Sequence, residues 1–518
     1  MSFTKGFLRE IAVYTGLALA VCPPLCRAQQ AGWLTWGYDE ERTGWNRAET
    51  TLTKDNVPGL KLKWAAQLDT APEMEVLSTL TSPLVVEGVR TAQGPKDLVI
   101  VAGSHDKIYA LDATTGAVVW QKEFTATEAP KQRSTYLCPN TVNATPVIDK
   151  ESGIVYLTTS DGKLRGLSIR DGEDRFPPTD FVAPYARNWS LNLIDGIIYT
   201  PVARGCGGAS ANFAAMDIKD PARPKTEFST STGRPAGAWG RGGLVRGPLG
   251  LYGQTADGPY DPDRGRFGQS IVAVNFKNLE LVDHFTPANW QDLNTRDIDL
   301  GSAGPVVFPF RQWTLLAAAG KEAVLYLLDA EALSGAGQHT PLYAGRWGND
   351  DVRLWGRGVW GSMATWEDAQ GERWLLMPMW GPPAQDVASR FQHSYGPAEQ
   401  GSIMAFRLVV EDAKPSVVPV WISRDMHVPD PPVVANGVVY AVATGENTRQ
   451  GGYFPPEVRA RPRGNATLYA FDAATGKVLY SSENLVESWA HFGGPAVAKG
   501  QVYFTTWDAK VYSFGIDK

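Results

Sequence analysis

The chain has 518 residues, a formal net charge of −6 and only 20% charged residues, together with 53 Gly, 36 Pro and 18 Trp. An acidic chain of this kind offers little to attract phosphates, so nucleic acid is excluded as an expected partner. Abundant Gly, Pro and aromatic residues are typical of many short strands joined by tight turns, and the length fits either three average domains or one large repeat assembly.

The first 28 residues predict a cleaved signal peptide. Lys5 and Arg9 precede an apolar run over residues 11–22, and small residues before the cleavage point suit cutting after Ala28. Removing this segment takes away three basic residues and one acid, so the net charge falls from −6 to −8. No later stretch approaches the roughly 20 apolar residues of a membrane-spanning helix. The mature chain is therefore expected to be periplasmic or secreted, with no membrane span.

Two cysteines, Cys138 and Cys206, remain after cleavage. In an oxidising compartment such a pair favours a disulfide over two free thiols. The chain has no C-x-x-C-H motif, so no covalently attached haem is expected, and its six histidines lack the H-E-x-x-H spacing of a zinc hydrolase.

A unit that ends in x-Y-A-L-D-x-x-T-G-x-x-x-W recurs along the chain. Its clearest copies are KIYALDATTGAVVW (107–120) and TLYAFDAATGKVLY (467–480). Six weaker copies begin at residues 163, 212, 270, 323, 402 and 510, and equivalent positions lie 43 to 78 residues apart. Alternating apolar residues around a D-x-x-T-G turn indicate hairpin-joined strands. The sequence therefore predicts an all-β, eight-bladed propeller of four-stranded antiparallel blades.

The last copy stops before its outer strand, and residues 60–69 (LKLKWAAQLD) have the pattern of an outer strand without inner ones. We therefore expect 60–69 to pair with 488–516 and close one domain over 60–518, because closure removes exposed strand edges. Residues 29–59 are expected to be a lead-in that runs over the surface. The Pro- and Gly-rich stretches 380–400 and 445–466 are expected to be loops, either at a site entrance or as surface decoration.

The repeat resembles that of the pyrroloquinoline quinone (PQQ) β-propeller proteins, over most of residues 33–518. The opening WLTWGYDEERTGWNRAETTLTKDNVPGLKLKW (33–64) is similar to the start of quinoprotein alcohol dehydrogenases. This resemblance implies the propeller fold. It leaves the function open, because similar repeats also build non-catalytic propellers such as the outer-membrane β-barrel assembly lipoproteins.

The resemblance also implies a set of site residues. Trp239-Gly240 matches the tryptophan that lies flat under the quinone, and Asp257 takes the place of a calcium-ligating Asn. Asp299, with Asp297 as second choice, matches the catalytic Asp that also contacts the metal, and Lys321 matches the basic residue at the quinone carbonyls. The alternative is that Trp239 only packs in the core, the three Asp residues belong to turns, and Lys321 is a solvated hairpin residue.

Three positions depart from the family pattern. Pro139 replaces the second of two adjacent cysteines, so Cys138, expected at the cofactor, is free to bond to Cys206 in a neighbouring blade. Ala144 stands where the family has a cofactor-binding Arg, and Ser210 where it has a calcium-ligating Glu. Losing these two groups is expected to weaken the binding of both metal and quinone.

Two functions remain open. The first is a periplasmic PQQ-dependent dehydrogenase that oxidises an alcohol or a sugar, with Ca²⁺ or a lanthanide polarising the quinone, Lys321 assisting and Asp299 as general base. The second is a non-catalytic propeller that binds a protein or glycan partner. Whether the chain is an enzyme therefore depends on whether its altered site still holds PQQ.

Overall fold

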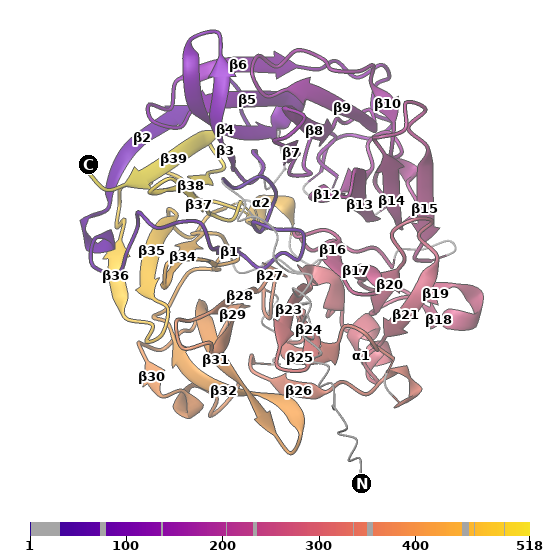
Figure 1. Ribbon diagram of the computed structural model, residues 1–518, viewed down its shortest axis with the longest axis vertical. Coiled ribbons are helices and arrows are strands. Elements are labelled where there is room, and N and C mark those ends of the chain that lie inside the picture. Colours follow the sequence, from indigo (N-terminus) through magenta and orange to yellow (C-terminus); the bar gives the residue numbers. More distant parts are fainter. Residues whose placement is uncertain are drawn as a thin grey trace. The chain divides into compact units, whose positions relative to one another are not determined.

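The computed structural model describes residues 1, 32–72, 79–135, 138–203, 205–231, 236–334, 336–349, 356–447, 455–459, 461–491 and 493–517. Two compact units are present, Met1–Gln30 and Ala31–Lys518, and the second contains all the secondary structure described below (Figure 1). The expected signal peptide, residues 1–28, lies outside the described residues except for Met1. No helix in the described ranges is long and apolar enough to cross a membrane.

Eight antiparallel sheets follow one another along the described chain as blades 1 to 8 (Figure 1), which confirms the predicted fold class. Blade 1 consists of β3 (Leu84–Thr91), β4 (Gly94–Gly103), β5 (Lys107–Asp112) and β6 (Val118–Glu123), and blade 2 of β7 (Val147–Asp149), β8 (Ile154–Thr158), β9 (Lys163–Ser168) and β10 (Thr179–Asp180). Blade 3 consists of β11 (Arg187–Asn188), β12 (Asn192–Ile194), β13 (Ile197–Ala203), β14 (Asn212–Asp217) and β15 (Lys225–Ser229). Blade 4 consists of β16 (Val245–Gly247), β17 (Gly250–Gln254), β20 (Ile271–Val274) and β21 (Leu281–Phe285).

Blade 5 consists of β23 (Val306–Phe310), β24 (Trp313–Ala318), β25 (Val324–Asp329) and β26 (Tyr343–Arg346). Blade 6 consists of β28 (Ala364–Glu367), β29 (Arg373–Trp380), β31 (Gly401–Glu411) and β32 (Lys414–Ile422), with β30 (His393–Ser394) added at the edge. Blade 7 consists of β33 (Val433–Ala435), β34 (Val438–Ala443), β35 (Thr467–Asp472) and β36 (Val478–Ser481), and blade 8 of β37 (Ala496–Ala498), β38 (Gln501–Thr505), β39 (Lys510–Gly515) and β2 (Lys61–Gln67).

Short elements lie between the blades. They are the strands β1 (Trp45–Asn46), β18 (Tyr260–Asp261), β19 (Arg266–Phe267), β22 (Ala303–Gly304) and β27 (Gly361–Ser362), the helices α1 (Trp290–Thr295) and α2 (Pro456–Arg459), and the 3-10 turns η1 (Val57–Gly59), η2 (Ser104–Asp106), η3 (Cys206–Gly208), η4 (Pro262–Arg264), η5 (Leu300–Ser302), η6 (Ala336–Gln338) and η7 (Ala388–Arg390).

Each sequence repeat forms the third strand of a blade. These strands are β5, β9, β14, β20, β25, β31, β35 and β39. Five of the six residues of β5 are buried, whereas exposed and half-buried residues alternate in the outer strand β15. The difference follows from the architecture, because inner strands are covered on both faces by neighbouring blades, whereas outer strands reach solvent.

Tryptophans of outer strands lock neighbouring blades together. The Trp120 indole of blade 1 donates a hydrogen bond of 3.0 Å to the Ile169 carbonyl of blade 2. Its ring lies over Gly172, where a Cβ atom would come within 2.7 Å of the indole. The same contact joins Trp64 to Gly116 and Trp421 to Gly476. The T-G and W positions of the repeat are therefore the two halves of one interface between blades.

The ring closes between the two ends of the propeller unit. Strand β2 pairs antiparallel with β39, from Lys61 opposite Gly515 to Gln67 opposite Lys510. Lys63 adds an exposed ion pair of 3.0 Å to Asp517. Because the outer strand of blade 8 comes from the start of this unit, blade 8 has all four strands only when both ends are present.

Residues 33–46, which we call the N-terminal belt, touch the inner strands of all eight blades. Their hydrogen-bond partners are Val85, Ile148, Leu191 and Asn192, Arg246, Val307, Thr365, Val434 and Val497, in blades 1 to 8 respectively. The belt thus satisfies backbone groups at the inner strand edges. The expectation of a surface lead-in is wrong for this stretch: Trp33 is 2% and Arg42 0% exposed, because the belt lines the inner ends of the blades.

Candidate functional site

The predicted site residues lie on one face of the propeller. In every blade, the turn between the second and third strands leaves the sheet at the same end as the connection to the next blade. Trp239 and Asp299 lie in the connections that lead into blades 4 and 5, whereas Asp257 and Lys321 lie in the second turns of these blades. The fold therefore opens all four positions on one face.

A buried ion pair lies at the centre of this group. The Lys321 ammonium is 2.6 Å from Oδ2 of Asp299, and the two side chains are 10% and 1% exposed. The same ammonium donates to the Asp297 carbonyl at 3.2 Å and lies 3.7 Å from its half-exposed carboxylate. The structure thus brings three predicted residues together, with Asp299 inside and Asp297 at the rim.

Asp257 joins the group through its backbone. Its N–H donates to Oδ1 of Asp299 at 3.2 Å, so both oxygens of that carboxylate have a donor. The next residue, Gly258, is held by Asn294, whose amide accepts from its N–H and donates to its carbonyl. This fixes the loop after β17 against the loop that carries Asp299.

Glycines allow these loops to approach so closely. A Cβ atom at Gly320 would lie 2.6 Å from the Asp299 carbonyl, and one at Gly358, where φ is +79°, would lie 2.5 Å from the Gly320 carbonyl. The close approach lets the Lys321 N–H donate to the Asp299 carbonyl at 3.0 Å. The ion pair is therefore positioned by backbone as well as by side chains.

Four buried tryptophans pack together as the tryptophan cluster, and two of them face the Lys321 ammonium: the four are Trp189, Trp239, Trp360 and Trp380. Trp360 and Trp380 stack with centroids 4.4 Å apart, and Trp360 meets Trp239 edge-on at 5.2 Å. The Lys321 ammonium lies 5.4 Å from the Trp239 ring and 5.3 Å from the Trp360 ring. Such contacts suit a cation–π interaction, which stabilises the ammonium away from water.

Two arginines that sequence reasoning missed lie beside this cluster. The guanidinium groups of Arg187 and Arg241 lie 4.5 and 5.1 Å from the Trp189 ring. Arg241 Nη1 also donates to the Asn143 carbonyl at 3.3 Å, next to Ala144, where the family arginine is lost. Burial lowers the pKa of Arg241 to about 10. The signal for Arg241 was its place two residues after Trp239, on the same connection.

Buried acids accompany these arginines. Glu446 Oε2 lies 2.6 Å from Nδ1 of His491, and Asp430 accepts a hydrogen bond from Gly494 N–H. Burial, and then the Asp430 charge, raises the pKa of Glu446 well above its usual value. Burial, followed by the charges of Arg241 and Arg187, lowers the pKa of His491. Both shifts favour an uncharged pair that shares one proton.

The cysteines form the predicted disulfide. Cys138 and Cys206 are bonded, with Cα atoms 5.5 Å apart, and link the connection after blade 1 to the second turn of blade 3. The expected contact between Cys138 and a cofactor stays a prediction. Residues after Cys206 lead into a cavity of about 620 Å³ between blades 2 and 3, which we call the blade 2–3 cavity, and Ser210 is part of its wall.

The ligand set suits a flat anionic ring better than a metal ion. In the described residues, no group of three or more His, Cys, Asp or Glu side chains is placed to hold a metal ion. Of the three predicted ligands, Asp299 is paired with Lys321, and Asp257 reaches Asp299 through its N–H. Indole rings and buried cations, in contrast, are groups that bind a planar, carboxylated quinone.

Comparisons with known proteins agree with this architecture. Residues 33–181 match the family described as glucose/ethanol/alcohol dehydrogenase, β-propeller domain. A europium-containing methanol dehydrogenase structure is similar with a TM-score of 0.62 at 12% identity, over 94% of this chain and 98% of that one. The chain therefore has the eight-bladed β-propeller fold of these quinoprotein dehydrogenases, and residues 33–181 match the PQQ propeller family.

Other comparisons support only the fold of this PQQ-type propeller. Quinohemoprotein alcohol dehydrogenase from Comamonas testosteroni superposes with a TM-score of 0.58 at 14% identity, over 94% of this chain and 81% of that one. A related enzyme from Pseudomonas putida HK5 gives a TM-score of 0.56 at 15% identity, over 94% and 80%. A search of curated proteins gave no match.

Proposed function

We propose that this PQQ-type propeller is a quinoprotein dehydrogenase that acts outside the cytoplasm on an alcohol or a sugar. The observation that carries the proposal is the Asp299 carboxylate, which is 1% exposed, lies 2.6 Å from the Lys321 ammonium and borders the tryptophan cluster. A carboxylate held in one orientation beside an aromatic face has the position that a general base needs.

The chain's own groups have distinct tasks in this proposal. The Trp239 face would support the ring, while Lys321 and Arg241 would neutralise its oxygens. Asp299 would accept the substrate hydroxyl proton at Oδ1, the oxygen not bonded to Lys321. PQQ, when bound, would supply the electron acceptor. No step is assigned to a metal ion, because the predicted aspartates do not form a ligand group in the described part of the chain.

Arg241 gives a reason why the loss at Ala144 need not abolish binding. Its guanidinium reaches the carbonyl next to Ala144 from a different strand connection, so a positive charge remains where the family has one. The charge is buried, since Arg241 is 2% exposed, and a buried cation binds an anion more strongly than an exposed one does.

A second candidate is the non-catalytic binding propeller. It is favoured by the tight packing of the tryptophan cluster, in which Trp239 is only 5% exposed and meets the edge of Trp360 at 5.2 Å. A quinone would have to move that edge aside. If the cluster does not open, the face is a closed core, and function lies elsewhere on the propeller.

The test is to add PQQ to the purified protein, with and without EDTA, and to record the bound quinone spectrum and dye reduction with a panel of alcohols and aldoses. We expect Trp239→Ala to lose the quinone, and Asp299→Asn to keep it but lose turnover, because an amide cannot accept the proton. Trp313→Ala, in the blade 5 sheet, is the matched control for losing an indole. Failure of the wild type to bind PQQ would leave only the binding propeller.

A further inference from the structure

The blade 2–3 cavity is a concave site that is separate from the tryptophan cluster. Its walls come from the second turns of blades 2 and 3, from the connections after blades 1 and 2, and from strands of both blades, including the outer strands β10 and β15. None of its lining residues belongs to the cluster or to the Asp299 group. Its volume, about 620 Å³, is that of a small-molecule site.

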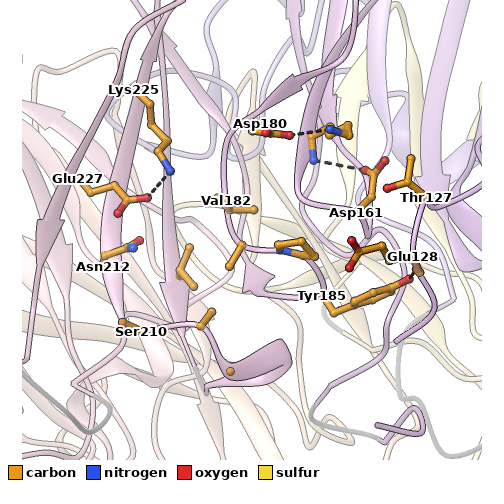
Figure 2. A pocket seen from close by; sticks show the side chains of 16 residues that line it. Thr127, Glu128, Asp161, Asp180, Val182, Tyr185, Ser210, Asn212, Lys225 and Glu227 are labelled. Carbon is orange, nitrogen blue, oxygen red and sulfur yellow. Dashed lines mark hydrogen bonds and ion pairs between the residues drawn. The ribbon is translucent and has the colours of Figure 1, made fainter. Parts of the chain in front are cut away.

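Two polar walls face each other across this cavity. Figure 2 shows Lys225, Glu227 and Asn212 on one side and Asp161 and Asp180 on the other. The charges are already matched within the protein. Lys225 lies 2.9 Å from Glu227, Lys163 lies 2.6 Å from Asp180, and Arg165 lies 2.9 Å from Asp161.

This pairing decides the charge of a suitable ligand. An anion would meet four carboxylates, those of Glu128, Asp161, Asp180 and Glu227. A cation would compete with an ammonium or guanidinium already bound to three of them. A neutral ligand rich in hydroxyls avoids both costs, since each hydroxyl can donate to a carboxylate and accept from an ammonium or amide.

Between the polar walls lies an apolar strip. Val182 and Val202 are 7% and 2% exposed, and Figure 2 shows Val182 between the two walls. Next to it, the Tyr185 hydroxyl donates to the Glu128 carbonyl, which ties the rim to the connection after blade 1. An apolar strip flanked by donors and acceptors matches a sugar ring, whose C–H face is apolar and whose edge carries hydroxyls.

The disulfide prepares this cavity for a ligand. Cys206 begins the turn η3, which leads into the wall at Ala209 and Ser210, and Cys138 lies in the connection that also carries Thr127 and Glu128. The bond therefore ties two of the lining loops together before any ligand binds, which reduces the entropy lost on binding.

We infer that the blade 2–3 cavity is a binding site for a neutral saccharide, held by its hydroxyls between Lys225, Glu227 and Asn212 on one side and Asp161 and Asp180 on the other. This site is separate from the proposed quinone site and does not depend on it.

The experiment is a calorimetric titration of the purified protein with maltose, cellobiose and lactose. The charge-neutral double variant Lys225→Ala/Glu227→Ala should weaken binding of the recognised sugar by about tenfold or more, or about 1.4 kcal/mol. The matched control, Lys510→Ala/Glu487→Ala, removes a pair on blade 8 and should leave affinity unchanged. The Lys225→Ala/Glu227→Ala variant should keep the PQQ binding of the wild type, which separates this site from the central one.

Three results would overturn the inference. They are no binding of any of the three sugars, equal binding by wild type and the Lys225→Ala/Glu227→Ala variant, or displacement of the sugar by spermine or citrate. The last result would mean that the cavity takes a charged ligand. Circular dichroism of each variant should match that of the wild type, so that a loss of binding reports the cavity and not the fold.

Discussion

Removing one member of the buried pair should destabilise the protein strongly. Lys321→Met keeps much of the length and apolar stem of the side chain but leaves the Asp299 carboxylate, 1% exposed, without its ammonium 2.6 Å away. Breaking a buried pair in this way typically costs about 3–5 kcal/mol, since the remaining charge is desolvated and uncompensated. Asp299→Asn added to Lys321→Met removes that charge and should recover much of the loss.

A double-mutant cycle measures the coupling free energy between Lys321 and Asp299. Urea unfolding of the wild type, both single variants and the double variant should give a coupling free energy above about 2 kcal/mol for Lys321 and Asp299. The matched control is Lys225 with Glu227, a pair at 2.9 Å whose side chains are both 40% exposed, which should give about 0–1 kcal/mol. If the unfolding transitions followed by fluorescence and by circular dichroism coincide, unfolding is two-state and the free energies of the variants can be compared. A coupling for the buried pair no larger than for the exposed pair would refute the reasoning.

Three further predictions follow from other residues. Gly172→Ala should lower the free energy of unfolding by about 1–3 kcal/mol more than Gly153→Ala does, because both glycines have φ near +70° but only Gly172 would place a Cβ against Trp120. Equal losses in urea titrations would contradict the role of Gly172 in the contact between blades 1 and 2. Arg241→Ala should weaken PQQ binding by about tenfold or more in a fluorescence titration, and an unchanged affinity would remove Arg241 from the site. Burial raises the pKa of Asp106 from 3.8 to about 6, so its contribution to stability should be lost as pH rises through about 6. Asp106→Asn should therefore gain up to about 3 kcal/mol over the wild type between pH 4 and 7, and parallel pH profiles would argue against it.

The fold could be predicted from the sequence because its cause is local. The turn glycine and the outer-strand tryptophan recur at fixed spacing, and the structure shows why: Gly172 leaves the room that Trp120 fills. Weak copies such as residues 163–176 still mark the third strand, here β9. The N-terminal belt could not be predicted in this way. It has no strand periodicity, and its partners lie in eight different sheets, although Trp33 and Trp36 were a sign that it is buried.

The residues of the candidate site also differ in whether the sequence could predict them. Trp239, Asp299 and Lys321 occupy equivalent places in successive turns and connections, so a repeat-based reading could bring them to one face. Arg241 and Arg187 could not be found by matching position to position, because they lie at residues where the family pattern expects nothing. The metal expectation failed to gain support for a physical reason: Lys321 already neutralises the Asp299 carboxylate.

The N-terminal belt imposes an order on how this protein is made. The belt leaves the ribosome before any blade exists, yet its last contact, from Asn46 to Val497, is with blade 8. Trp33 can pair with Val85 as soon as blade 1 is made, whereas Asn46 must wait for the synthesis of more than four hundred further residues. During that interval the nascent chain carries an aggregation-prone aromatic segment near its N-terminus. Efficient production should consequently depend on a chaperone that shields this segment until the ring is complete.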